Sequence, residues 1–230
     1  MKGNRYTAFF GFWVYFPSRF IRLISHFRFK KIENWRYSFH SIWIWPIELI
    51  VLVFDLMGFP DFIMQVRLLV NKEIRSLTKE EIKIIDDFYG VIPFTQQVWM
   101  NPRDFFKFRR FAYAFVFHNS INYHKSISVP VMIHEFMHVI QYHLVGSVYI
   151  VRALFAQRST EGYNYGTPMT IYNDMMIGKK IWDYNYEQQA QIMQDYYELS
   201  RSGSTIPIVL EAGYESLLLN VKDEVMKLKF

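Results

Sequence analysis

The stretch Val131–Leu144, VMIHEFMHVIQYHL, contains the pattern HExxH at His134, Glu135 and His138. Side chains four residues apart lie on one face of an α-helix, so both imidazoles can reach a single metal ion. Glu135 lies one residue along, close enough to act as a general base on a water molecule without being a ligand. The expected number of such patterns by chance in this composition is roughly 0.01. The stretch therefore predicts a metal site built on a helix.

The residues around the motif favour this helix. Pro130 suits a first helical turn, and apolar side chains follow on both sides of the motif. The chain has no cysteine, so any zinc must be held by histidine and carboxylate ligands. We therefore expect one Zn²⁺ per chain. The alternative is a buried helix whose two histidines are ordinary core residues and bind no metal.

A catalytic zinc usually has three protein ligands and leaves one position open. His143 lies five residues after His138, about 140° round the helix, and should point away from the metal. Glu187 is the better candidate, because it begins a predicted helix in which Ala190 leaves room for close helix packing. An acid that only favours the helix dipole is the non-functional interpretation of Glu187. Two other carboxylates could take the ligand role: Glu161 and Asp195.

The rest of the chain predicts an α+β fold that is mostly helical, with a small β-sheet packed on the HExxH helix. Thr78 and Glu81 form a capping box that begins a helix, and Gly90 ends it. Two strands are expected ahead of the motif: Val91–Met100 and Arg110–Phe117. Three further helices are expected: Ile42–Phe54, buried and beginning near Pro46, then Glu187–Leu199 and Pro207–Leu228.

Composition and charge divide the chain into two parts. Apolar residues make up 51% of the 230 residues and charged residues 20%, which is typical of a globular protein. Residues 1–40 carry eight Lys and Arg against Glu33 alone, a net charge of +7, whereas the remainder carries −2. We therefore expect a basic, aromatic N-terminal arm with an apolar helix at residues 1–58. The catalytic domain is expected at residues 59–230.

Several interpretations of the arm compete. A signal peptide is disfavoured, because Pro17-Ser18-Arg19-Phe20 is a poor cleavage site after the apolar stretch Ala8–Phe16. Three others treat the arm as part of the mature protein. The first is that it packs its aromatic side chains on the catalytic domain with its cations outward. The second is contact with a membrane surface through residues 1–45, where aromatics alternate with Lys and Arg. The third, binding of nucleic acid, is not expected because no recognition motif accompanies the charge. Ile42–Phe54 is too short for a membrane-spanning helix.

The motif HEFMH, followed by the Glu-x-x-Ala helix at Glu187 and Ala190, resembles the gluzincin metallopeptidases. The resemblance implies a zincin-like minimal core in which Glu187 is the third zinc ligand. In several members an aspartate four residues after this glutamate orients a ligand histidine. Gln191 occupies that position here, and its amide oxygen would be a neutral acceptor for the same imidazole.

A second resemblance covers roughly residues 50–200. The segments IHEFMHVIQ, GSVYIVRALFAQ, GYNYG and YNYEQQAQIMQDYY are similar to those of small, poorly characterised bacterial zincin-like proteins. Relatives in that group are associated with contractile injection systems, type VI secretion and Rhs- or Vgr-related proteins. The resemblance implies a secretion apparatus as a partner. It leaves the cellular address open between the cytoplasm, a membrane surface and export without a signal peptide.

If the chain is an enzyme, the motif predicts hydrolysis of a peptide or related amide bond, with Glu135 moving the proton of a zinc-activated water to the leaving amine. An edge strand near Arg110–Phe117 could hold the extended substrate, as in zincins generally. Several side chains could stabilise the oxyanion: Tyr163, Tyr165, Tyr184, Tyr186, His118, His124 and Arg158. The rival hypothesis is a non-hydrolytic, zinc-stabilised payload, adaptor or membrane-surface scaffold, which would not need the Glu135 carboxylate.

Overall fold

The computed structural model describes residues 8–27, 35–102, 114–203 and 207–228, with side chains described from residue 15 and, after the first gap, from residue 44. The helices of these residues are α1 (Ala8–Phe27), α2 (Trp35–Leu56), α3 (Phe59–Val70), α4 (Lys79–Tyr89), α5 (Val129–Val145), α6 (Val148–Arg158), α7 (Pro168–Met176), α8 (Tyr186–Arg201) and α9 (Ile208–Met226). The strands are β1 (Arg75–Ser76), β2 (Trp99–Asn101), β3 (Ala114–Phe117) and β4 (Ser120–Tyr123).

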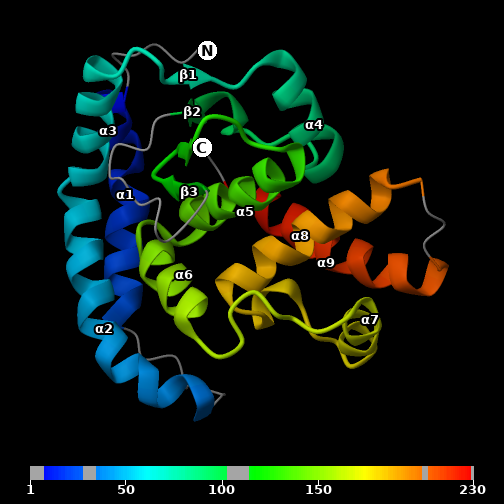
Figure 1. Cartoon of the computed structure of the whole chain (residues 1–230). Coiled ribbons are helices and arrows are strands. Elements are labelled where there is room, and N and C mark those ends of the chain that lie inside the picture. The colour runs from blue at the N-terminus through cyan, green and yellow to red at the C-terminus, as the bar shows by residue number, and fades with distance from the viewer. Residues whose placement is uncertain (1–7, 28–34, 103–113, 204–206, 229–230) are drawn as a thin grey trace.

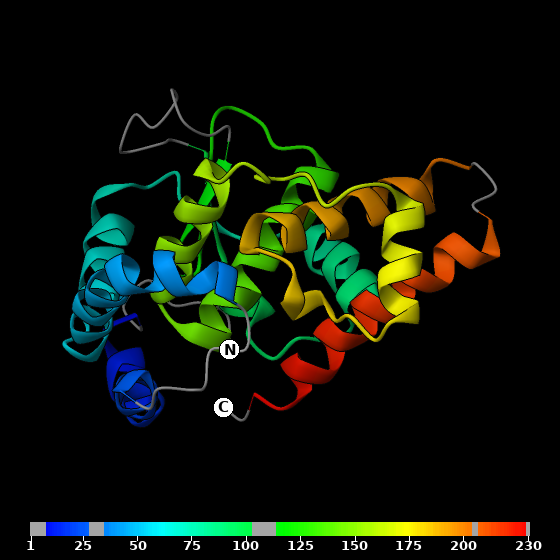
Figure 2. The same ribbon diagram turned by 90° about the horizontal axis from the view of Figure 1, so that it is seen from below.

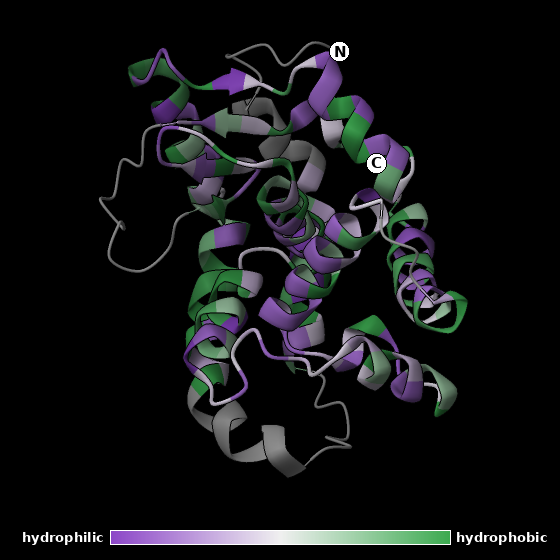
Figure 3. Cartoon of the chain, turned by 45° about the vertical axis from the view of Figure 1, so that its right-hand side comes forward, coloured by the Kyte–Doolittle hydropathy of each residue, from purple (hydrophilic) through white to green (hydrophobic). Residues whose placement is uncertain are grey.

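Helix α5, which carries the HExxH motif, lies in the middle of the molecule (Figure 1). Helices α1, α2 and α3 lie at one end and α7 and α9 at the other, as two perpendicular views show (Figures 1 and 2). Hydrophobic and hydrophilic residues are interspersed along the described helices (Figure 3), as expected for helices that bury one face. The motif helix is therefore enclosed by the rest of the chain.

The sheet has the order β1-β2-β4-β3, in which β2 and β4 are parallel and the other pairs antiparallel. Strands β3 and β4 both contact α5. Ile121 of β4 and Ile133 and Phe136 of α5 are fully buried in one core cluster. The expected α+β class, mostly helical with a small sheet on the motif helix, is confirmed.

The strand expected at Val91–Met100 is wrong over most of its length. The chain forms a turn after Ile92 and a 3₁₀ turn at Thr95–Gln97, and only Trp99–Asn101 forms a strand. Pro93 cannot donate to a sheet ladder, and the turns still bury most of the apolar residues of the segment, although Val91 is exposed. The second expected strand is confirmed at Ala114–Phe117. Its first four residues, 110–113, lie outside the described residues.

The apolar helix of the arm also differs from the expectation. Helix α2 begins at Trp35 rather than near Pro46, which lies inside it. It is not buried, since Ile47 and Ile50 are largely exposed. In the described part of α1 the cations do not point outward, because Arg19 is buried against Asp61. None of the described helices is long and apolar enough to cross a membrane.

Candidate metal centre

Two helix termini set the positions of the candidate ligands. Helix α5 has Pro130 in its first turn and ends at Gly146, whose φ of 72° suits glycine, so both motif histidines lie in a continuous helix. Helix α8 begins after Asn185, whose side chain accepts a hydrogen bond from the backbone N–H of Gln188. This cap places Glu187 in the first turn, facing α5.

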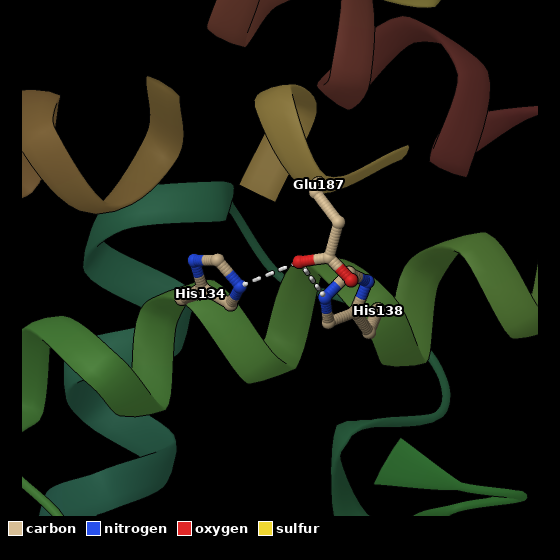
Figure 4. Close-up of side chains that lie close together, drawn as sticks. All are labelled: His134, His138 and Glu187. Atoms are coloured by element: carbon tan, nitrogen blue, oxygen red, sulfur yellow. Dashed lines mark ion pairs between the residues drawn. The ribbon is translucent and has the colours of Figure 1, made fainter. Parts of the chain in front are cut away.

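The structure brings together His134, His138 and Glu187 (Figure 4). The Nε2 atoms of His134 and of His138 each lie 3.6 Å from Oε2 of Glu187. A tetrahedral zinc with bonds of about 2.0–2.1 Å would hold its ligand atoms about 3.3 Å apart. The three side chains are buried, as protein metal ligands commonly are. Two of the three ligand-atom separations are thus a few tenths of an ångström longer than in a tetrahedral zinc site, and all three ligand atoms lie within 4.8 Å of one another. The cluster could therefore hold a single metal ion.

The three groups are also electrostatically matched. Burial favours the neutral form of Glu187, but the neighbouring histidines, His138 most of all, outweigh it and lower the pKa of Glu187 to about 2. Burial acts to lower the pKa of His138, and the Glu187 carboxylate outweighs it and raises the pKa to about 9. For His134 burial dominates, and its pKa is lowered. Glu187 therefore supplies a carboxylate that balances positive charge at the centre of the cluster.

Gln141 sets the tautomer of His138. The Gln141 amide donates from Nε2 to the carbonyl of Tyr186 (3.0 Å) and to Oε1 of Gln189 (2.9 Å). Its Oε1 must therefore face Nδ1 of His138, 2.7 Å away, and accept a hydrogen bond from it. In the neutral imidazole the proton then lies on Nδ1, and the lone pair on Nε2 faces Glu187 and the metal position.

Gln191 does not have the orienting role expected of it. Its amide donates to Oδ1 of Asp195 at 2.7 Å, and Nδ1 of His134 has no hydrogen-bond partner among the described residues. Sequence reasoning missed Gln141 as the acceptor. The available signal was its spacing, since a residue three positions after His138 lies on the same face of α5.

This contact predicts an effect on metal affinity. Gln141→Leu should weaken zinc binding about 10- to 100-fold, because such partners of metal-bound histidines orient the ring and raise its basicity. Gln191→Leu is the matched control and should bind zinc as the wild type does. Competition with a chromophoric chelator measures both affinities, and thermal unfolding checks that both variants are folded. Equal affinities in the two variants would show that the contact with Gln141 is dispensable.

Glu135 is buried on α5 between the two motif histidines, and one of its carboxyl oxygens has no hydrogen-bond partner among the described residues. The residue is 5% exposed, and the oxygen in question is Oε2. Burial raises the pKa of Glu135 to about 7, with a lowering effect from His138 and a further raising effect from Glu187. A buried carboxyl with a free oxygen and a pKa near neutrality is suited to accept and release a proton.

Among the expected oxyanion donors, Tyr163 lies against the cluster. Its ring centroid is 5.9 Å from that of His134, and the side chain is 39% exposed, so it stands where the site meets the surface. Its hydroxyl accepts a hydrogen bond from Gln157. Burial and the Glu187 carboxylate raise the pKa of Tyr163, which keeps the hydroxyl protonated and able to donate.

The other expected donors have different environments. The hydroxyl of Tyr184 donates to Asp174, and that of Tyr186 accepts from Arg152. Both tyrosines join the site through their backbone, since their carbonyls accept hydrogen bonds from the glutamine network around His138. Arg158 is exposed at the end of α6. Two further candidates form hydrogen bonds with other carboxylates: Tyr165 and His118.

The remaining ligand candidates are outside the cluster. His143 forms a hydrogen bond with Asn119 at 2.8 Å and stacks on Phe94, pointing away from the metal position as its helical spacing predicts. Glu161 is exposed, and Asp195 accepts hydrogen bonds from Gln191 and from a tyrosine.

No protein-family model, curated protein or solved structure matches this chain. The resemblance to the gluzincins therefore stays an expectation that rests on the motif residues.

Proposed function

We propose that this protein is a zinc-dependent hydrolase that cleaves peptide or related amide bonds. The observation that carries the proposal is the buried Glu135 carboxyl beside three potential ligand atoms, with one oxygen that has no hydrogen-bond partner in the described part of the chain. A purely structural metal site has no need of an unpaired carboxyl next to it. Burying such a group costs free energy, about 1–3 kcal/mol for a polar group left without its hydrogen bond.

The donor set favours zinc. Two imidazole nitrogens and one carboxylate oxygen, at His134, His138 and Glu187, form the ligand set of several zinc hydrolases, whereas Mg²⁺ and Ca²⁺ prefer oxygen ligands only. Three ligands leave the fourth tetrahedral position open for reacting groups. When bound there, zinc would act as a Lewis acid on the scissile carbonyl and make water a stronger nucleophile.

The protein's own groups would then move the protons and hold the charge. Glu135 accepts a proton from the attacking water and delivers it to the leaving amine, which its raised pKa permits. Tyr163, protonated and at the mouth of the site, donates a hydrogen bond to the oxygen on which negative charge develops. Gln141 keeps the His138 ring in one orientation throughout.

Strand β3 is the element best placed to bind an extended substrate. It is the last strand of the sheet order among the described residues, and it contacts α5. An edge strand can bind an extended peptide by main-chain hydrogen bonds with little dependence on its side chains. We therefore propose a peptide or protein substrate.

The rival is a non-hydrolytic module in which zinc ties α5 to α8, two helices that pack closely against each other. Its specific support is that all three ligand side chains are buried, as in many structural sites. A secretion apparatus or a membrane surface would be its partner. This non-hydrolytic module would have no chemical role for the Glu135 carboxylate.

Metal removal tests the function directly. The zinc-loaded chain, incubated with a mixture of peptides of diverse sequence, should produce new peptide termini detectable by mass spectrometry. Treatment with a chelator should abolish the cleavage, and one equivalent of zinc should restore it, because the proposed chemistry requires the metal. Absence of new termini with the zinc-loaded chain would count for the non-hydrolytic module.

A further inference from the structure

Helices α1, α2 and α3 present apolar stripes to the outside of the molecule. The exposed large hydrophobic residues recur at helical spacing on each helix and are 38% to 70% exposed. They are Phe16, Phe20, Ile21, Ile24 and Phe27 on α1, Ile47, Ile50, Val53 and Phe54 on α2, Met57 after it, and Phe59, Phe62, Val66, Leu69 and Val70 on α3. We refer to this set as the apolar face. A ring contact between Phe54 and Phe59, with centroids 5.3 Å apart, joins α2 to α3 within it.

The opposite side of the same helices is polar and points into the protein. On α1 the residues Tyr15, Arg19, Arg22 and His26 follow the helical repeat and face inward. The arrangement is therefore the reverse of a water-exposed helix, which buries its apolar stripe and solvates its charges.

These inward groups connect the three helices to the rest of the fold. Arg19 forms a 2.6 Å ion pair with Asp61 of α3. Asp55 accepts a hydrogen bond from the backbone N–H of Ser147 at 2.7 Å, and Glu48 pairs with Arg152 of α6 at 2.7 Å.

Arg22 donates to the carbonyl of His143 at 2.8 Å. Because these contacts hold α1–α3 against α5 and α6, the apolar face is fixed on the outside of the domain.

The apolar face is too large for an ordinary surface in water. It holds fifteen of the twenty-six exposed large hydrophobic side chains of the described residues. At about half exposure these side chains together present on the order of 1,000 Å² of apolar surface on three helices that contact one another. The largest single patch on a typical soluble monomer is about 300–600 Å². Such a surface needs a covering partner.

Charge in the flanking sequence selects the partner. The sequence before α1 and between α1 and α2 contains five of the chain's cations, in residues outside the described ranges: Lys2, Arg5, Arg28, Lys30 and Lys31. Glu33 is the only acidic residue in the first 40. An apolar helical surface flanked by Lys and Arg matches a bilayer, whose acyl region takes the apolar side chains and whose anionic headgroups attract the cations.

We propose that the apolar face of α1–α3 binds to an anionic lipid bilayer, with its apolar side chains in the boundary between headgroups and acyl chains. None of the described helices is long and apolar enough to cross a bilayer, and the proposed contact is an interfacial one. The proposal is independent of the metal centre, because none of the residues of the apolar face is a candidate ligand.

Vesicle flotation of the full chain tests the proposal. The wild type should float with phosphatidylcholine vesicles that contain phosphatidylserine, and more weakly with phosphatidylcholine alone. The triple variant Phe20→Glu, Ile50→Glu and Phe62→Glu puts one charge on each helix of the apolar face and should bind at least tenfold more weakly. The matched control is Val91→Glu, Ile177→Glu and Leu219→Glu, at comparably or more exposed apolar positions elsewhere, and should bind as the wild type does.

The flanking charges have a separate readout. Lys30→Gln together with Lys31→Gln should weaken binding to anionic vesicles about 20- to 30-fold, since each cation near an anionic surface contributes about a factor of five. Binding to neutral vesicles should not change.

A site-specific fluorescent label measures the same membrane contact without placing a charged residue on the apolar face. Because the chain has no cysteine, Phe62→Cys and Leu219→Cys can each carry one environment-sensitive fluorophore. Anionic vesicles should shift the emission of the label at position 62 to the blue and leave the label at position 219 unchanged. Equal flotation of the wild type and the apolar-face variant would overturn the proposal. So would a wild type that ignores vesicles but forms a dimer that the same variant dissociates, which would make the face a contact between two copies.

Discussion

Glu187→Ala should yield a protein that contains no zinc, whereas His143→Ala should contain one zinc per chain, as the wild type is expected to. Glu187 lies 3.6 Å from the Nε2 atoms of both motif histidines and supplies the carboxylate of the set. Without it, only two neutral ligands remain, and a catalytic zinc usually requires three. His143 is equally buried but forms its hydrogen bond with Asn119, so it is a matched histidine control.

Elemental analysis after dialysis against a weak chelator measures the zinc content of each variant. Glu187→Gln, which is close in size to glutamate, is the second variant and should lose zinc as well, in case alanine leaves a cavity that disturbs α8. Circular dichroism shows whether each variant is folded. Wild-type zinc content in both Glu187 variants would remove Glu187 from the site and reopen Asp195 as a ligand.

The sequence predicted helices α4 and α8, whose first turns carry capping residues that can be recognised from the sequence alone. The capping box of Thr78 and Glu81 is present as expected, and Gly90 follows the last turn of α4. Helix α8 begins within one residue of the expected start, after the cap of Asn185. These signals involve residues within four positions of each other, so the chain carries them whatever the tertiary structure is.

Gly213 shows why a helix can tolerate a residue that its propensity disfavours. It lies inside α9, where a Cβ atom would come within 3.2 Å of the backbone of Tyr172 on α7. The absence of a side chain allows the two helices to approach closely. Only the tertiary structure reveals this reason, because Tyr172 is remote in the sequence.

The orientation of α1 could not be predicted from its own sequence. Its spacing shows two faces, one apolar and one cationic, and ordinary burial of apolar side chains suggests that the cations point outward. The inward orientation depends on Asp61 and on the carbonyl of His143, which lie on other helices and pair with Arg19 and Arg22. Amphipathic spacing therefore identifies the faces of a helix but not the medium that each face meets.

The candidate metal ligands could be predicted more fully than their surroundings. Helical geometry alone places His134 and His138 together, and a first-turn acid on a helix that packs against them is a natural third ligand. The glutamine network could not be predicted, since Gln141 contacts Gln189 across α5 and α8. Which tyrosine lies at the site also depends on the loop before α7, and only the fold distinguishes Tyr163 from the others.

Glu135→Gln should reduce hydrolysis by about 10²- to 10⁴-fold, the contribution of a positioned general base, while zinc content stays at the wild-type level. Glutamine has nearly the same shape but cannot accept the proton. Because the Glu135 carboxyl is buried and its pKa is raised to about 7, a neutral amide there should not destabilise the fold. Loss of activity would then have a chemical cause and not a structural one.

Glu161→Gln is the matched control, because it makes the same substitution at an exposed position outside the cluster, and its rate should equal that of the wild type. Cleavage of a peptide identified with the wild type, followed under saturating and limiting substrate, separates kcat from KM. A loss confined to kcat would assign Glu135 to the chemical step, whereas a loss confined to KM would assign it to binding. If Glu135→Gln cleaves as fast as Glu161→Gln with zinc in place, the proton must be taken by another group, and the proposed mechanism is wrong even though the metal site stands.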